Sequence, residues 1–230
     1  MIADRFPAGR PAWEAAGATL VTDVAPFEAM KLRLLNASHS ALAYLGYLAG
    51  AETVADAMRD PGLASFAARV MDDAIATLTV PSGTDMAAYK RSLLERFRNP
   101  ALRHRTWQIA MDGSQKLPQR LLGTVRDNLH AGRRIDMLAL AVAGWMRYAS
   151  GRDEGGREIV VSDPLAGEFG RIAAAHRGDP PALARAFLGL RAIFGDDLPA
   201  DPRFSGSVAS WLSALFADGA ACTVARAAAA

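Results

Sequence analysis

The stretch MKLRLLNASHS, residues 30–40, lies inside a long apolar run that is rich in helix-forming residues. Pro26 suits the first turn of a helix, and the carboxylate of Glu28 suits its positive end. Gly50 is a plausible stop for the same helix, because glycine commonly ends helices. The pattern therefore predicts one long helix over residues 26–49, and the polar residues of the quoted stretch lie on it.

The rest of the sequence predicts further helices. Ala, Leu, Arg and Met dominate it, and β-branched runs are confined to residues 18–24 and 158–161. Residues 135–149 are apolar almost all round, which is typical of a central core helix, and the Ala-rich tail from Thr223 is expected to be frayed. A chain of 230 residues can bury one large core, so we expect one all-α, multi-helical domain over residues 1–230. The other expected helices are 52–59, 61–78, 85–99, 101–110, 117–130, 164–176, 181–194 and 204–217.

The composition excludes several function classes. Lys and Arg total 26 against 24 for Asp and Glu, and a net charge of +2 spread along the chain predicts no nucleic-acid partner. The single cysteine, Cys222, excludes an internal disulfide and is expected to pack as a small apolar group. No two histidines are spaced to share a helical face, so no metal site is predicted. No segment reads as a signal peptide or a membrane span, and a cytoplasmic location is the default expectation.

Three polar side chains on the predicted long helix form a candidate catalytic group. At about 100° per residue, Lys31 and His39 share a face with leucines, and Asn36 lies about 60° further round. A lysine amine can exchange a hydroxyl proton, an amide N–H can stabilise a developing alkoxide, and a neutral imidazole can orient a sugar hydroxyl. The rise of about 12 Å from Lys31 to His39 would flank a polyol of about six carbons. Taken singly, each also fits an ordinary role: a solvated lysine, a mid-helix amide, and a packed or surface imidazole.

Several short motifs along the chain point to one family. Together with the quoted stretch, they make the chain resemble the long-chain polyol dehydrogenases of the mannitol dehydrogenase family. The resemblance is specific up to about Asp163 and looser after it. The motifs are Arg5-Phe6, Arg10-Pro11-Ala12-Trp13, Asp23-Val24, Pro26-Phe27-Glu28, Ala43-Tyr44-Leu45-Gly46, Arg96-Phe97, Asn99-Pro100 and Asp112-Gly113-Ser114-Gln115-Lys116.

The resemblance covers only one of the two domains of that family. It implies that residues 1–230 correspond to the helical C-terminal substrate domain, with a fold like the C-terminal domain of 6-phosphogluconate dehydrogenase-like enzymes. The family's N-terminal Rossmann domain, which binds most of the NAD or NADP, is expected to be absent, because the glycines of residues 151–156 lack the dinucleotide fingerprint. The isolated chain is then expected to be inactive, and a separate Rossmann-domain chain becomes one conceivable partner. The family is metal-independent.

The resemblance also assigns roles to the polar residues. Lys31 would be the general acid/base, Asn36 one half of an oxyanion-stabilising pair, and His39 a group that orients the reacting hydroxyl. Lys116, which ends the motif from Asp112, would contact the distal oxygens of the substrate. No cofactor-binding residue can be assigned on this chain.

One departure from the mannitol-specific pattern bears on the substrate. The resemblance leads us to expect a polyol-binding arginine at position 108, where this chain has Gln108. Residues 104–111 instead resemble the fructuronate reductase, or mannonate oxidoreductase, branch, whose substrates carry a carboxylate. His104, Arg105 and Lys116 are therefore candidates to meet a negative charge, although His104 and Arg105 would also fit a solvated helix surface.

Two functional hypotheses remain open at this point. In the first, the chain is the substrate-binding and catalytic half of an NAD(P)-dependent oxidoreductase that interconverts a secondary alcohol and a ketone. D-mannonate and D-fructuronate are favoured as substrates, and D-mannitol and D-fructose come next. In the second, the chain is a non-catalytic helical interaction or oligomerisation module derived from such an enzyme.

Overall fold

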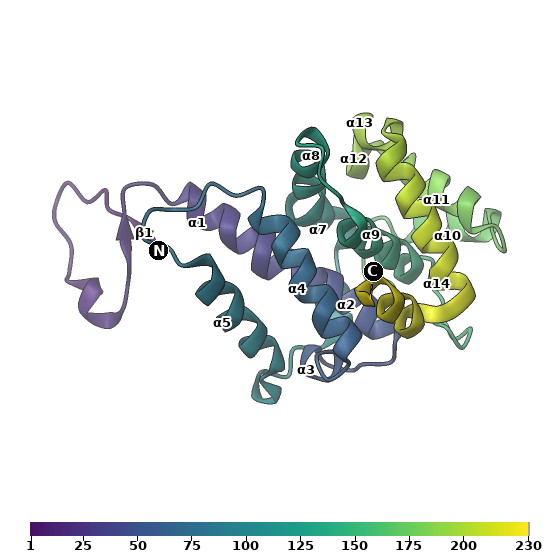
Figure 1. The fold of residues 1–230 in the computed structure, drawn as a ribbon, viewed down its shortest axis with the longest axis horizontal. Helices are drawn as coiled ribbons and strands as arrows, with labels where there is room; N and C mark the ends of the chain where they lie inside the picture. Colours follow the sequence, from purple (N-terminus) through teal and green to yellow (C-terminus); the bar gives the residue numbers. More distant parts are fainter. Residues whose placement is uncertain (230) are drawn as a thin grey trace.

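Helices form almost all of the regular structure in this computed structural model, which describes residues 1–229. The expected all-α, multi-helical fold is confirmed. Within the described residues the only strands are β1 (Ile2–Ala3) and β2 (Leu20–Val21), which pair in parallel with Ile2 opposite Leu20. The two strands belong to an arm that projects from the helical body (Figure 1).

The helices follow one another through short connections. The α-helices are α1 (Ala25–Met30), α2 (Ala37–Leu48), α3 (Val54–Ala57), α4 (Pro61–Ile75), α5 (Met86–Arg98), α6 (Thr106–Ala110), α7 (Gly113–Leu117), α8 (Gly123–His130), α9 (Asp136–Ala149), α10 (Ala166–Ala175), α11 (Pro180–Leu188), α12 (Arg191–Phe194), α13 (Asp197–Ala200) and α14 (Pro202–Ala229). Two π-helical segments, η2 (Lys31–Asn36) and η4 (Pro118–Leu122), and two 3₁₀ turns, η1 (Trp13–Ala16) and η3 (Pro100–Leu102), complete the set.

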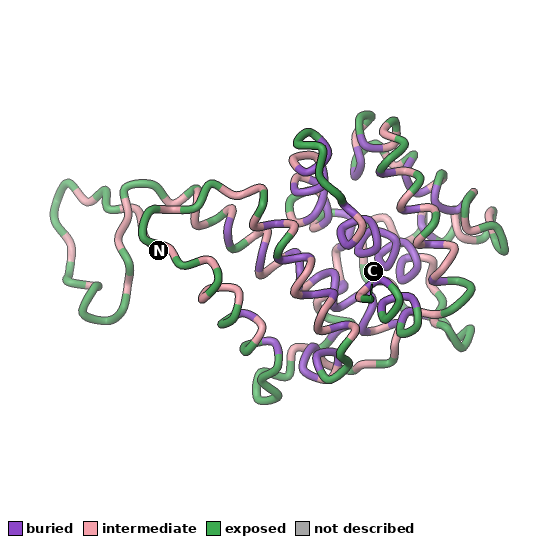
Figure 2. Tube along the Cα trace, viewed as in Figure 1, coloured by how far each residue is buried: buried purple, intermediate pink, exposed green. Residues whose placement is uncertain are grey.

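Helix α9 is the centre of the core, as its apolar sequence predicts. Every residue from Met137 to Ala149 is buried, and the helix packs against α2, α4 and α14. The buried class is concentrated around these helices in Figure 2. Trp145 on α9 makes edge-on contacts with Phe169 and Phe187, with ring centroids 5.4 and 5.5 Å apart. Burial of such large aromatic side chains dominates the energetics of a core.

The predicted long helix is continuous but not uniform. Segments α1, η2 and α2 run from Ala25 to Leu48, and the residues at both junctions keep right-handed helical backbone angles. The middle six residues, Lys31 to Asn36, are π-helical. A π-segment holds one more residue per hydrogen-bonded turn than an α-helix, and such segments are common at functional sites. The prediction was right in extent and wrong in the geometry of its centre.

The prediction of one helix over residues 101–110 was wrong. Arg103 adopts a left-handed backbone conformation with φ 45°, which ends η3 after Leu102. The backbone of Arg105 then forms an antiparallel bridge with Thr53, so α6 starts only at Thr106. A left-handed residue in this segment interrupts the helical hydrogen bonds that the sequence pattern suggests.

The prediction for residues 117–130 was right about helix but placed its start too late. Helix begins at Gly113, directly after Asp112 in a left-handed conformation with φ 54°. The Asp163 carboxylate accepts hydrogen bonds from Ser114 N at 2.8 Å and Ser114 Oγ at 2.7 Å, so a distant residue supplies this cap. Pro118 lies within the helical run, at the start of η4.

The C-terminal tail is helical, contrary to expectation. Helix α14 extends to Ala229, with a kink at Gly219 where φ is 77°. Thr223, Val224 and Ala227 are buried, because the tail packs against α4. Cys222 is exposed, so its predicted packing was wrong.

Two further segments differ from the sequence pattern. Residues 158–161 form no strand; Glu158 makes only an isolated bridge with Arg152. Residues 181–194 are divided between α11 and α12, because the helix stops at Gly189.

By length and composition alone, α14 is apolar enough to cross a membrane, but it packs on α9, α11 and α4 like the core helix of a folded domain.

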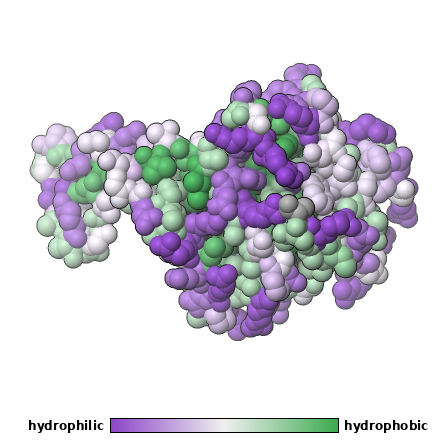
Figure 3. Space-filling view, viewed as in Figure 1, coloured by the Kyte–Doolittle hydropathy of each residue, from purple (hydrophilic) through white to green (hydrophobic). Residues whose placement is uncertain are grey.

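The surface is mixed in character on the side shown in Figure 3. Hydrophilic residues cover much of the helical body, and apolar residues gather over α1, where the arm joins the body. In Figure 1, α1 and the start of α5 lie at the end of the helical body from which the arm projects. The polar residues of the long helix begin where α1 ends.

Candidate functional site

Three elements meet at His39. This residue lies on α2 and is half-buried. Its ring stacks on Phe97 of α5, with centroids 5.0 Å apart and planes 17° apart. The ring of His104, from the turn before α6, lies edge-on with its centroid 5.2 Å away. The structure therefore brings together two of the predicted site residues, His39 and His104, which are distant in sequence.

Positive groups surround His39. Its Nε2 atom is buried and has no hydrogen-bond partner among residues 1–229. Burial, and to a smaller extent the neighbouring His104, Arg120, Arg96 and Lys116, lower the pKa of His39 to about 4. The imidazole is therefore neutral at pH 7, and its Nε2 atom is free to bond a ligand hydroxyl.

Lys116 is held by the backbone of the segment before its own helix. Its Nζ atom donates hydrogen bonds to the carbonyl oxygens of Met111 at 2.5 Å and Ile109 at 3.3 Å. Burial lowers its pKa. The two carbonyls fix the position of the amine but do not neutralise it, so Lys116 adds a positive charge near His39.

Arg120 is a site residue that the sequence analysis missed. It lies in η4, four residues after Lys116, and its Nη1 atom donates a hydrogen bond to Ser40 Oγ at 2.8 Å. Burial lowers its pKa. Within residues 1–229, no carboxylate lies within 4 Å of the charged groups of Arg96, Lys116 or Arg120. In the sequence, only the position of Arg120 four residues after Lys116 could have indicated that it belongs to the candidate site, and this spacing is weak evidence by itself.

The other predicted residues have no recorded contact with His39. Lys31, the first residue of η2, is exposed, and Asn36, the last, is half-buried. They share the continuous helix with His39 but are not in contact with it through any hydrogen bond. Arg105 and Gln108 are exposed. The contacts and charges around His39 thus include His104 and Lys116 and do not include Arg105 or Gln108.

The described residues offer little to a metal or a nucleotide. No group of three His, Cys, Asp or Glu side chains in residues 1–229 could hold a metal ion. A dinucleotide pyrophosphate needs a glycine-rich turn between a strand and a helix, and β1 and β2 lead into no such turn within the described part of the chain. The arrangement can bind and orient a hydroxylated or anionic ligand through neutral His39 and the surrounding cations.

The chain matches proteins that act on sugars and related compounds. Residues 23–216 match the family described as the mannitol dehydrogenase C-terminal domain. The chain is 55% identical over 209 residues to the D-mannonate oxidoreductase of Escherichia coli (strain K12), a match that covers 90% of this chain and 43% of that protein. It is 35% identical over 233 residues to the mannitol 2-dehydrogenase of Phaeosphaeria nodorum, covering 98% of this chain and 39% of that protein.

A solved structure has the same fold. The mannitol 2-dehydrogenase of Pseudomonas fluorescens, in a ternary complex with NAD and D-mannitol, superposes with a TM-score of 0.89 at 34% identity. The match covers 97% of this chain and 45% of that one. The chain thus spans less than half the length of each of these three proteins.

Proposed function

Since the chain belongs to the mannitol dehydrogenase family through its C-terminal domain, we propose that it forms the substrate-binding and catalytic half of an oxidoreductase. The reaction interconverts a secondary alcohol and a ketone on a sugar acid or a polyol. The observation that carries the proposal is neutral His39, with an unbonded Nε2 atom, among positive groups that no carboxylate pairs. That environment suits a hydroxylated substrate that carries an acid group.

The residues of this chain fit the substrate end of such a site and not the nucleotide. The orphaned Nε2 atom of His39 fits a hydroxyl group, whereas the described residues form no pyrophosphate cradle. NAD or NADP would be held mainly by the nucleotide-binding part that family members carry. When bound, the nicotinamide would accept or supply the hydride.

Lys31, Asn36 and His39 would divide the remaining chemistry. In the oxidation direction, the amine of Lys31 takes the proton of the reacting hydroxyl as the ketone forms. The side-chain amide of Asn36 donates to the oxygen on which negative charge develops. Neutral His39 bonds the hydroxyl through Nε2 and orients it. Lys31 is exposed on this chain, so its desolvation would come from the nucleotide-binding part.

The charges favour a sugar acid over a polyol. Lys116 and Arg120 have no carboxylate within 4 Å among residues 1–229, and both remain close enough to lower the pKa of His39. A substrate carboxylate would give Lys116 and Arg120 a close ionic partner, because charge-assisted hydrogen bonds to carboxylates are among the stronger ones. D-mannonate and D-fructuronate are therefore the preferred pair, and D-mannitol and D-fructose the second. The match to D-mannonate oxidoreductase supports this order.

A chimera tests the proposal. This chain would replace the matching part of the Escherichia coli D-mannonate oxidoreductase, and NADH oxidation would be followed with D-fructuronate and with D-fructose. We expect turnover with D-fructuronate in preference to D-fructose. Lys31→Ala should lower kcat by about 10²- to 10⁴-fold, the usual contribution of a general acid/base. Arg91→Ala, which removes an exposed charge of α5, should leave kcat unchanged.

Substrate binding by this chain provides a second measurement. Arg120→Gln in the chimera should raise the KM for D-fructuronate by about tenfold and change the KM for D-fructose little. A folded chimera that turns over neither compound would refute the proposal and favour the interaction-module hypothesis. Full activity after Lys31→Ala would refute the role of the lysine alone.

A further inference from the structure

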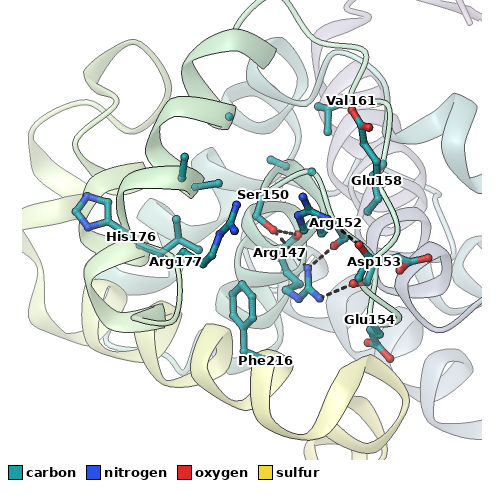
Figure 4. Close-up of a pocket in the computed structure, with 18 of the residues that line it drawn as sticks. Arg147, Ser150, Arg152, Asp153, Glu154, Glu158, Val161, His176, Arg177 and Phe216 are labelled. Atoms are coloured by element: carbon teal, nitrogen blue, oxygen red, sulfur yellow. Dashed lines mark hydrogen bonds between the residues drawn. The ribbon is translucent and has the colours of Figure 1, made fainter.

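A cavity of about 740 Å³ lies away from the cluster around His39. It opens between the C-terminal end of α9, the loop over residues 150–161, the end of α10 and α14 (Figure 4). None of Lys31, Asn36 and His39 lines it. Its volume lies in the range of pockets that bind small molecules, and its chemistry differs from that of the first site.

Arg147 forms the floor of this cavity. The side chain is only 6% exposed and lies over the ring of Phe216, with Cζ 4.4 Å from the ring centroid. It donates hydrogen bonds to the carbonyl oxygens of Arg152 and Asp153, at 2.5 and 3.1 Å. Its Nε atom is buried and has no partner among residues 1–229. A buried cation is normally paired with an anion; the nearby carboxylates of Glu154 and Asp153 favour the charged form of Arg147, but within residues 1–229 neither lies within 4 Å of its guanidinium.

Two more guanidinium groups face the same space. Arg177, which follows α10, extends toward the middle of the cavity in Figure 4, whereas His176 beside it points away. Arg152 lines the cavity from the loop and donates to the carbonyl oxygen of Gly156 at 2.8 Å. Within the described residues, neither arginine has a carboxylate within 4 Å.

The acidic residues of the wall are largely engaged elsewhere. Asp153 pairs with Arg157 at 2.8 Å. Glu154 accepts a hydrogen bond from the backbone N–H of Ala220, the first residue after the kink in α14. Only Glu158 contributes a carboxylate with no such partner among residues 1–229. With Asp153 paired to Arg157, three arginines of the cavity face two carboxylates, those of Glu154 and Glu158, and within residues 1–229 none of these arginines has a carboxylate within 4 Å.

The remaining wall is apolar. Val160 is 86% exposed and Phe216 is 41% exposed, although both are large apolar residues. Ala173, Ala174 and Leu183 line the same space. Contact with an apolar group would remove this surface from water, which is favourable in proportion to the area covered.

We propose that this cavity binds a small organic anion, with its carboxylate held by Arg177 and Arg152 and its apolar body against Phe216 and Val160. Arg147 adds a buried positive charge beneath the bound carboxylate. The site is independent of the oxidoreductase function proposed above and would remain if that function were disproved. The ligand class is a carboxylate that carries an apolar chain or ring, in contrast to the polyhydroxylated substrate of the first site.

Calorimetric titration of the full chain tests this site. Phenylbutyrate serves as the probe, phenylbutanol as its uncharged analogue, and inorganic phosphate as an anion without an apolar part. We expect saturable binding of phenylbutyrate with a Kd at or below about 1 mM. Arg177→Gln should weaken binding about tenfold or more, because it removes an ionic hydrogen bond to the carboxylate of the probe. Arg177 is exposed, so the variant should still fold. Arg171→Gln, an exposed position on α10 outside the cavity, should have no effect.

Each result decides one part of the proposal. Phe216→Ala should also weaken binding, and far-ultraviolet circular dichroism would establish that the variants are folded. No saturable phenylbutyrate binding by the wild-type chain would overturn the site. Equal binding of phenylbutanol, or unchanged binding by folded Arg177→Gln, would overturn the role of charge. Equal binding of inorganic phosphate would overturn the role of the apolar wall.

Discussion

Single side chains determine the charge at the cluster around His39. The imidazole is neutral because burial, together with the neighbouring His104, Arg120, Arg96 and Lys116, opposes its protonation. This property connects folding with pH, since His39 binds a proton more weakly in the folded chain than in the unfolded one.

His39 should make the chain less stable in acid. Its pKa falls from 6.5 in the unfolded chain to about 4 in the folded one. The unfolded chain then binds more protons between these values, so stability is lost as the pH falls from 6.5 toward 4, by up to about 3 kcal/mol. In urea unfolding at pH 7 and pH 4, His39→Gln should lose less stability than the wild type over this interval. An equal loss in both proteins would contradict the assignment.

Asp73 should have the opposite effect at higher pH. Burial raises its pKa from 3.8 to about 6, so the folded chain binds more protons than the unfolded one between these values. The resulting stabilisation is present below pH 3.8 and is lost as the pH rises through 6, by up to about 3 kcal/mol. Asp73→Asn should therefore raise the urea midpoint at pH 8 and change it little at pH 3.5, whereas Glu95→Gln, on the exposed side of α5, should not. A midpoint lowered at pH 8 would exclude this explanation.

The sequence could suggest candidate site residues but not how they group in space. Lys31, Asn36 and His39 were proposed because they lie close together in one helical stretch. Arg120 was missed because its partner, Ser40, is 80 residues away, and no local pattern records a contact between distant helices. The roles of Lys31 and Asn36 remain predictions.

Whole elements were predictable where their signals are local. The extent of the long helix and the burial of α9 follow from apolar periodicity, and Asp85 caps α5 as its position suggests. The π-segment η2 could not be predicted, because no residue type marks the extra residue. The early start of α7 depends on Asp163, which is distant in sequence.

Helix α7 depends on a close contact that only glycine allows. A Cβ atom at Gly113 would lie 2.3 Å from Trp145 Nε1 and 2.9 Å from Tyr44 Oη. Gly113→Ala should therefore destabilise the fold by about 1–3 kcal/mol or more, the usual cost of overpacking. Gly167→Ala on α10, where nothing lies within 4 Å, should stabilise it by about 0.5–1 kcal/mol. Thermal unfolding compares the two variants, and equal midpoints would refute the steric argument.

At the scale of the whole molecule, the C-terminal tail closes the core over α4. Arg69 Nη1 donates a hydrogen bond to the carbonyl oxygen of Ala227 at 2.7 Å, and the backbone of Ala225 lies 3.3 Å from the position of a Cβ on Gly62. The tail was expected to fray because its alanine-rich sequence has no apolar pattern that indicates which positions are buried. Its buried positions become clear only once α4 is placed beside it.

Removal of the tail should destabilise the entire domain. A chain that ends at Asp218 loses the buried side chains of Val224 and Ala227 and exposes the surface of α4 that they cover. We expect the Tm to fall by about 10 °C or more, since 1 kcal/mol corresponds to about 2–4 °C for a domain of this size. Removal of residues 228–230 alone should change the Tm by no more than about 2 °C. Circular dichroism during heating measures both, and an unchanged Tm for the longer truncation would show that the tail is dispensable.

The π-segment also constrains how the chain can evolve in length. Compared with an α-helix, η2 contains one surplus residue. Deleting one of its residues would therefore convert it to ordinary α-helix, and the long helix from α1 to α2 would remain continuous. Because the widened turn accommodates the surplus residue, the helices on its two sides would keep nearly the same rotation about the axis, and Lys31 and the arm would keep nearly the same direction relative to His39. The segment is thus the place in this long helix where the loss of a single codon would disturb the alignment of the two halves least, whereas the same deletion within α1 or α2 would rotate one half by about 100° relative to the other.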